Sequence, residues 1–75
     1  MKFTPDELEA LDFAAKTKAK QLLQEGRTEV DTRDRDTGVQ LLMDALHINR
    51  KRARAMMDYL IEKANDLVRA AQQEN

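Results

Sequence analysis

The sequence contains no cysteine, one proline and two glycines among its 75 residues. Without cysteine, neither a disulfide framework nor a cysteine-based zinc cluster can supplement the hydrophobic core. A chain of this length makes at most one domain, and we expect residues 1–75 to form it. Because a small domain buries only about 60–65% of the surface that its unfolded chain exposes, its margin of stability is thin.

Long apolar runs are also missing. No segment approaches the roughly 20 apolar residues of a membrane-spanning helix, and the N-terminus lacks the apolar core of a signal peptide. We therefore expect a cytoplasmic protein with no membrane partner.

Features that mark enzymes and cofactor sites are equally scarce. The chain offers no nucleophile–base pair, no glycine-rich phosphate loop and too few residues to enclose a pocket of the usual ~300 Å³ or more. His47 is the only histidine, and no cysteine or acidic cluster completes a metal site with it. We expect neither enzymatic activity nor a cofactor or metal.

What the sequence does have is a concentrated patch of positive charge. The formal net charge is −1, which argues against a general nucleic-acid binder. Residues 50–54, however, carry four cations and no acid, whereas residues 55–75 carry two cations against four acids. One local patch on a neutral to acidic chain suits a directed contact.

The segment FTPDEL near the N-terminus has the sequence of a helix start. Thr4 can act as the N-cap and Glu7 completes a capping box. Gly26 provides a stop, so we predict a helix over residues 5–24. The apolar face of this helix consists of residues that recur at helical spacing: Leu8, Leu11, Ala15, Ala19 and Leu22. Phe13 lies outside this face.

Residues 25–36, EGRTEVDTRDRD, contain one apolar side chain, Val30, and predict a solvated loop. A short edge strand over residues 28–32 is the alternative. The run DTRDRD lacks the ligand spacing and closing glutamate of an EF-hand loop, and its opposite charges largely cancel.

Two further helices are joined by a short turn, HIN at residues 47–49. The first of them covers residues 37–46, capped by Asp36 or Thr37, with an inward face of Val39, Leu42, Ala45 and Leu46. Asn49 is a good N-cap for the last helix, which nothing breaks before about residue 72. The prediction is an all-α, three-helix domain with a helix-turn-helix, its helices at residues 5–24, 37–46 and 50–72.

Apolar residues of the last helix recur at spacings of four and three: Ala53, Met57, Leu60, Ala64, Leu67 and Ala71. The second half of this face needs apolar cover. Either the first helix packs antiparallel along it, or two chains pair through residues 57–71 as a homodimer. The homodimer would present two such helices to two DNA half-sites.

The last helix begins with cations where the helix dipole favours anions. Arg50, Lys51 and Arg52 fall in its first turn, and each is unfavourable there by roughly 0.3–1 kcal/mol. With Ala53 at the centre of the buried face, Arg54 joins Lys51 and Arg52 on the outward arc. In a helix-turn-helix, the start of the second helix faces the bases in the major groove, so DNA would supply the missing negative charge.

Other interpretations of this patch stay open. It can be a solvated basic face in which Arg54 and Asp58 pair at i,i+4, or it can contact a protein partner. His47 is expected to bond a phosphate or the backbone. Tyr59 either bonds a phosphate through its hydroxyl or packs at the edge of the core.

Residues 42–60, LMDALHINRKRARAMMDYL, resemble two helices of the gamma domain of FtsK-type DNA translocases, a small winged-helix module. The matching positions are Leu42, Leu46, Ile48, Arg52, Ala53, Asp58 and Leu60. The resemblance implies that Arg52 lies at the DNA-facing start of the recognition helix. The family's strand and wing are missing, because residues 61–75 lack glycine and proline and continue as helix. The chain would then be a wingless winged-helix relative without the motor.

The sequence therefore predicts a small helix-turn-helix DNA-binding protein, a transcriptional regulator or accessory factor of bacterial or phage type. Its partner would be double-stranded DNA, and the residues predicted to bind it are Asn49, Arg50, Lys51, Arg52, Arg54, His47 and Tyr59. The alternative is a small helical adaptor, or a phage-type inhibitor of a host protein, that binds another protein through the same patch.

Overall fold

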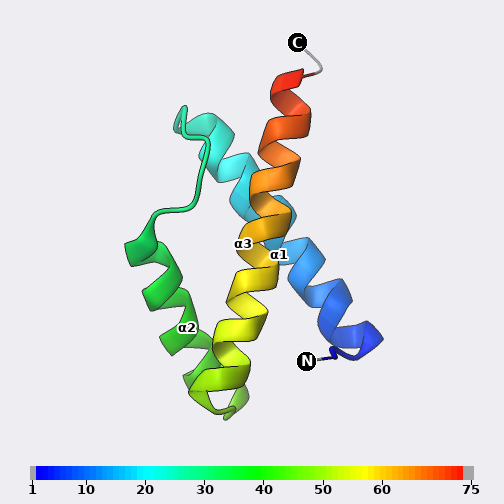
Figure 1. Ribbon diagram of the computed structural model, residues 1–75, viewed down its shortest axis with the longest axis vertical. Helices are drawn as coiled ribbons and strands as arrows, with labels where there is room; N and C mark the ends of the chain where they lie inside the picture. The colour runs from blue at the N-terminus through cyan, green and yellow to red at the C-terminus, as the bar shows by residue number, and fades with distance from the viewer. Residues whose placement is uncertain (1, 74–75) are drawn as a thin grey trace.

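The computed structural model describes residues 2–73, and in this range the chain forms three α-helices and no strand (Figure 1). α1 spans Pro5–Gln24, α2 spans Thr32–Leu46 and α3 spans Arg50–Gln73. Both other helices pack on α3, α2 beside its first half and α1 across its middle. The predicted all-α, three-helix fold is confirmed.

The start and end of α1 follow from local chemistry. The Thr4 hydroxyl accepts a hydrogen bond from the Glu7 amide at 3.1 Å, and the Glu7 carboxylate accepts one from the Thr4 amide at 2.9 Å. This is the predicted capping box. At the other end, Gly26 takes a φ of +70° and the Arg27 amide donates to the Leu22 carbonyl at 2.8 Å. Glycine adopts this left-handed conformation without a steric penalty, so α1 ends where predicted.

α2 begins at Thr32, so the predicted start at residue 37 is wrong. Asp31 is its N-cap, and the Asp31 side chain accepts a hydrogen bond from the Arg33 amide at 2.9 Å. The first turn of this helix lies in the charged run that the sequence assigned to a loop. An aspartate N-cap satisfies one of the free amides of that turn and so marks a helix start without any apolar residue.

Ion pairs to the other helices anchor the charged first turns of α2. Asp34 pairs with Lys18 of α1 at 3.1 Å, and Arg35 pairs with Asp58 of α3 at 2.7 Å. The hydrogen bond from Lys18 and its positive charge hold the pKa of Asp34 below its ordinary value. Apolar periodicity gave no sign of these turns, because their partners are charged and lie far away in the sequence.

α1 and α3 run in the same direction, so the expected antiparallel packing is wrong. The contacts advance together along both helices, since Glu7 meets Arg52 and Asp12 meets Tyr59 further on. The two helices cross near their middles (Figure 1). α2, which follows α1 in the chain, runs in the opposite direction. The start of α3 is therefore close to the start of α1.

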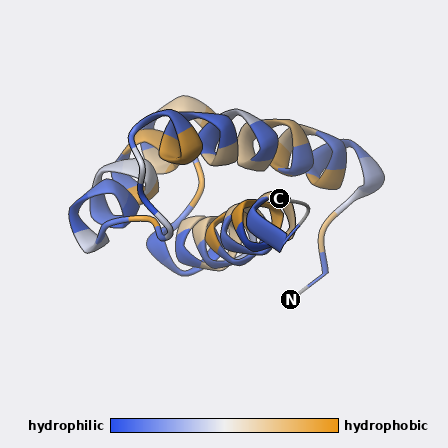
Figure 2. Ribbon diagram, turned by 90° about the horizontal axis from the view of Figure 1, so that it is seen from above, coloured by the Kyte–Doolittle hydropathy of each residue, from blue (hydrophilic) through white to orange (hydrophobic). Residues whose placement is uncertain are grey.

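Within residues 2–73, a buried cluster lies on each side of α3. The first joins α1 to α3 and contains Ala15, Ala19, Leu22, Ala64 and Val68. The second joins α2 to α3 and contains Val39, Ala53 and Met57. Leu60 packs against both clusters. Figure 2 shows apolar residues interleaved with hydrophilic ones along the helices, as expected for helices with one buried face.

The inward face of α2 differs from the predicted one in its last turn. Val39 is buried and Leu42 is half-buried, as expected, but Ala45 and Leu46 are exposed. Met43 packs on the α2–α3 cluster in their place.

The chain itself covers most of the apolar face of α3, although Leu60, Leu67 and Ala71 are only half-buried. Met57, Ala64 and Val68 are no more than 7% exposed; Met57 packs with α2, and the other two pack with α1. A homodimer through residues 57–71 needs this face as its seam. In the structure α1 packs on the second half of this face, but parallel to α3 and not antiparallel as expected.

Candidate nucleic-acid interface

The turn between α2 and α3, residues 47–49, positions the basic patch. His47 has a φ of 53° and a ψ of 44°, a left-handed conformation that is uncommon for a residue other than glycine. Ile48 packs on the α2–α3 cluster. Asn49 caps α3 as predicted, because its Oδ1 accepts a hydrogen bond from the Arg52 amide at 2.9 Å. The start of α3 is therefore fixed by backbone, apolar and capping contacts, and the His47 side chain is exposed beside it.

Three of the four cations in the patch are exposed: Arg50, Lys51 and Arg54. None of them makes an ion pair with a carboxylate of residues 2–73. We call these three side chains the basic tip. The first turn of α3 contains no acid, so positive side chains and the positive end of the helix dipole coincide there.

Arg52 does not face outward, which corrects its predicted place on the outward arc. Its Nη2 donates to both carboxylate oxygens of Glu7, at 2.6 and 2.7 Å. Its guanidinium carbon lies 5.8 Å from the centre of the Phe3 ring, a cation–π distance. The Arg52 side chain is only 28% exposed. The reason is the parallel packing of α1 and α3, which brings the acidic start of one helix beside the basic start of the other.

Glu7 serves both helix starts at once. It completes the capping box of α1 and receives the guanidinium of α3. The pKa of Glu7 lies below its ordinary value, chiefly because the hydrogen bond from the Thr4 amide, and next the one from Arg52, favour the charged carboxylate. One carboxylate therefore offsets one cation of the patch and leaves the basic tip uncompensated within residues 2–73.

Tyr59 packs at the edge of the core, one of the two alternatives that the sequence left open. Its hydroxyl donates to Asp12 Oδ1 at 2.8 Å. Its ring meets the Phe3 ring edge-on, with 5.8 Å between centres. The hydrogen bond to Asp12, and then partial burial, raise the pKa of Tyr59 above its ordinary value. The hydroxyl is thus engaged by a carboxylate of the protein itself.

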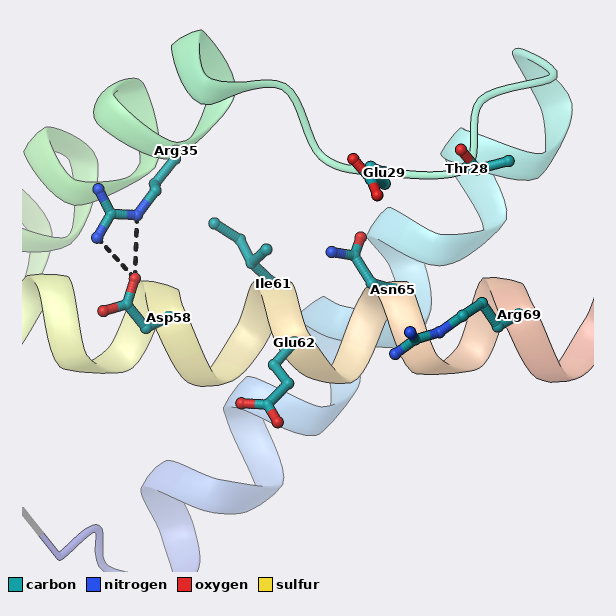
Figure 3. Close-up of a pocket in the computed structure, with 8 residues that line it drawn as sticks. All are labelled: Thr28, Glu29, Arg35, Asp58, Ile61, Glu62, Asn65 and Arg69. Atoms are coloured by element: carbon teal, nitrogen blue, oxygen red, sulfur yellow. Dashed lines mark hydrogen bonds and ion pairs between the residues drawn. The ribbon is translucent and has the colours of Figure 1, made fainter.

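Beyond the basic tip, the outward side of α3 becomes acidic. Asp58 accepts two hydrogen bonds from Arg35, at 2.7 and 3.0 Å (Figure 3). Asp58 therefore pairs with α2, and the alternative in which Arg54 pairs with Asp58 is not observed. Glu62 follows one turn later and is exposed. On α3, the favourable charge for a polyanion is therefore concentrated in the first two turns.

A polar hollow of about 380 Å³ lies between the loop before α2 and the outward side of α3 (Figure 3). Asn65 points toward the loop, and its Oδ1 accepts a hydrogen bond from the Val30 amide at 3.3 Å. Charges of both signs line the hollow, which gives it no preference for a ligand of one sign. Within residues 2–73, no group of three His, Cys, Asp or Glu side chains could hold a metal ion.

Sequence reasoning named Arg52 and Tyr59 but missed their partners, Phe3, Glu7 and Asp12. The sequence predicts only a capping role for Glu7 and indicates no role for Asp12. The signal that could have found these contacts is charge complementarity, because an acidic helix start and a basic helix start occur in one short chain.

Among residues 2–73, no helical stretch combines the length and the apolar character that a membrane-spanning helix requires. No family model, curated protein or solved structure matches this chain. What the protein does must therefore be inferred from the chemistry of its surface.

Proposed function

We propose that this protein binds double-stranded DNA with the basic tip of α3, as a small regulator or accessory factor of bacterial or phage type. The observation that carries the proposal is a contrast within the patch. Arg52 has a counter-charge in Glu7, whereas Arg50, Lys51 and Arg54 have none among residues 2–73. Exposed cations at the positive end of a helix dipole attract a polyanion.

The path of the chain supports a helix-turn-helix interpretation of α2 and α3. A three-residue turn joins the two helices, and they pack through Val39, Ala53 and Met57. In such a motif, the start of the second helix enters the major groove. The likeness of residues 42–60 to FtsK gamma domains agrees with this placement, except that Glu7 already engages Arg52.

The charge of the basic tip sets the expected strength and salt dependence of binding. With three phosphate contacts, the slope of log K against log salt concentration is about −2.7 per chain. The affinity should therefore fall roughly 40-fold between 50 and 200 mM salt. Binding by an isolated chain is best measured at low salt.

The test is fluorescence anisotropy with a short duplex of mixed sequence. In the variant Arg50→Ala/Lys51→Ala/Arg54→Ala, affinity at low salt should fall by roughly 100-fold, because the phosphate contacts are lost. Arg52 stays unchanged, since its replacement would also disrupt the pair with Glu7.

A matched control removes the same charge elsewhere. The variant Lys16→Ala/Lys20→Ala/Lys63→Ala should lose only a few-fold in affinity, because it alters overall charge and leaves the basic tip intact. An equal loss in both triple variants would contradict binding through the tip.

The same three cations could meet an acidic protein surface, as the adaptor alternative requires. Selection of bound sequences from a random DNA pool separates the two readings. A DNA-binding protein enriches related sequences, whereas failure of the wild-type chain to retain DNA at low salt would leave the adaptor as the better explanation.

A further inference from the structure

The outer flank of α1 carries an apolar groove that the fold does not fill. Phe13 is 73% exposed and Leu23 is 41% exposed, and both line a hollow of about 440 Å³ together with Leu67 of α3. Ala19, which is buried, and Thr17, which is exposed, complete the lining. The Thr17 hydroxyl already donates to the Phe13 carbonyl at 3.1 Å. Single exposed apolar residues are common, but a contiguous exposed group lining one concave surface marks a contact site.

Two positive charges stand at the rim of this groove. Lys16 and Lys20 line it and are exposed, and neither makes an ion pair within residues 2–73. Lys18, which lies between them in sequence, instead pairs with Asp34 of α2 at 3.1 Å. The groove thus combines an apolar floor with uncompensated cations on one side.

A second copy of this chain fits the groove poorly. In a two-fold dimer whose axis passes through the groove, Lys16 and Lys20 would face the equivalent lysines of the other copy. Like charges brought together at an interface are unfavourable. The charge pattern therefore disfavours self-association through this surface.

A flat anionic membrane fits it poorly as well. Glu9 is exposed one helical turn before Phe13 and shares its flank of α1. A planar anionic surface meets this whole flank and would be repelled by that carboxylate, whereas a single helix can place its own acids beside the lysines alone. Leu67 is half-buried at the side of the groove, where a protruding side chain can reach it more easily than a bilayer surface can.

We propose that this groove binds an acidic amphipathic helix of another protein. A leucine or phenylalanine of that helix would enter the hollow between Phe13, Leu23 and Leu67. Carboxylates on the flank of the same helix would pair with Lys16 and Lys20, which is a helix-in-groove mode with charge complementarity.

The groove and the basic tip are far enough apart to act together. Leu67 lies thirteen residues after Arg54 on one continuous helix, which corresponds to about 20 Å along the axis. A chain bound to DNA at its tip could therefore hold an acidic partner at the same time. The groove proposal itself does not depend on DNA binding.

The experiment uses the full chain as bait against a displayed library of helix-forming peptides. Recovered peptides are synthesised, and their affinities are measured by fluorescence anisotropy. We expect them to combine leucine or phenylalanine at helical spacing with several acids. Lys16→Glu/Lys20→Glu and, separately, Phe13→Ala should each weaken binding at least roughly tenfold.

Matched variants on other surfaces keep the result specific. Lys51→Glu/Arg54→Glu changes the same charge at the basic tip, and Leu41→Ala removes an apolar side chain that is 62% exposed on α2; both should bind the peptides as wild type does. Circular dichroism checks that each variant is folded. Unchanged DNA affinity in the Phe13→Ala variant keeps this test separate from that of the DNA proposal.

Four outcomes would overturn the proposal. They are recovery of no peptide, recovery of peptides without acids, co-sedimentation with phosphatidylserine vesicles that requires Lys16 and Lys20, and a dimer in sedimentation that Phe13→Ala abolishes. The third would assign the groove to membranes and the fourth to a second copy of the chain.

Discussion

The starts of α1 and α3 lie beside each other but carry opposite charge. The first turn of α1 contains Asp6 and Glu7, which complement the positive end of its dipole. The first turn of α3 contains no acid and begins with Arg50 and Lys51. Both helices nevertheless have a side-chain N-cap, Thr4 in one and Asn49 in the other.

The difference shows that helix stability does not explain the basic tip. Both helix starts are stabilised by a side-chain N-cap, so the first turn of α3 has the same local stabilisation as that of α1, apart from its charge. Glu7 compensates Arg52, yet the neighbouring cations stay exposed at positions that oppose the dipole. The proposed contact with DNA would supply the negative charge that these cations lack within residues 2–73.

Reversing the charge of the basic tip should have the largest effect. In Arg50→Glu/Lys51→Glu/Arg54→Glu, DNA affinity at low salt should fall by more than about 100-fold. The free energy of unfolding should rise by about 1 kcal/mol, because acids now complement the dipole of α3. Anisotropy and urea denaturation measure the two quantities. If the variant lost both DNA affinity and stability, the cations of the basic tip would be stabilising α3. That result would contradict the conclusion that helix stability does not explain them.

Removing the two caps should have similar effects on stability. Thr4→Ala and Asn49→Ala should each lower the free energy of unfolding by about 1 kcal/mol, because an amide in each first turn loses its acceptor. Urea denaturation monitored by circular dichroism provides the values. If Asn49→Ala has no effect, the start of α3 is not held as the structure describes.

Neutralising Glu7 should change how the free energy of unfolding depends on pH in acid solution. The native pKa of Glu7 is lowered, so its contribution is present above the ordinary value of 4.5 and is lost as the pH falls through the native pKa. In Glu7→Gln, the free energy of unfolding should therefore fall less steeply as the pH is lowered. The part of the fall that remains comes from Asp34, whose pKa is also lowered. DNA affinity should rise about two- to threefold, because the charge of Arg52 is no longer offset.

Glu9→Gln is the matched control for that experiment. It removes one carboxylate from the same helix without touching Arg52. If its acid unfolding curve flattens as much as that of Glu7→Gln, then the contact between the two helix starts is not the source of the pH dependence.

Replacing Tyr59 should have the smallest effect on DNA binding. Tyr59→Phe should leave affinity within about twofold, because the hydroxyl is bonded to Asp12 rather than turned toward a phosphate. The raised pKa of Tyr59 means that its contribution to stability is present below the ordinary value of 10.0 and is lost as the pH rises through the native pKa. The unfolding free energies of wild type and Tyr59→Phe should therefore differ below pH 10 and converge as the pH rises through the native pKa. A large loss of DNA affinity would place Tyr59 in the interface.

Local chemistry explains which parts of the fold were predictable. Thr4 marks the start of α1 and Gly26 marks its end. Both were predictable because a cap and a left-handed glycine affect only the few residues next to them. Asn49 marked the start of α3 in the same way. The first turn of α2 escaped prediction, because ion pairs with Lys18 and Asp58 anchor it in place of an apolar face.

The sequence by itself determined three helices, their boundaries to within a residue except for the start of α2, and the concentration of cations at the start of the last helix, because caps, apolar period and charge are local properties. Only the tertiary structure decided that α1 and α3 run in the same direction. That choice brought Glu7 to Arg52 and left Arg50, Lys51 and Arg54 without a partner in residues 2–73. A cation remains exposed when no carboxylate of another helix packs beside it. The spacing of residues within one helix cannot predict such contacts between helices.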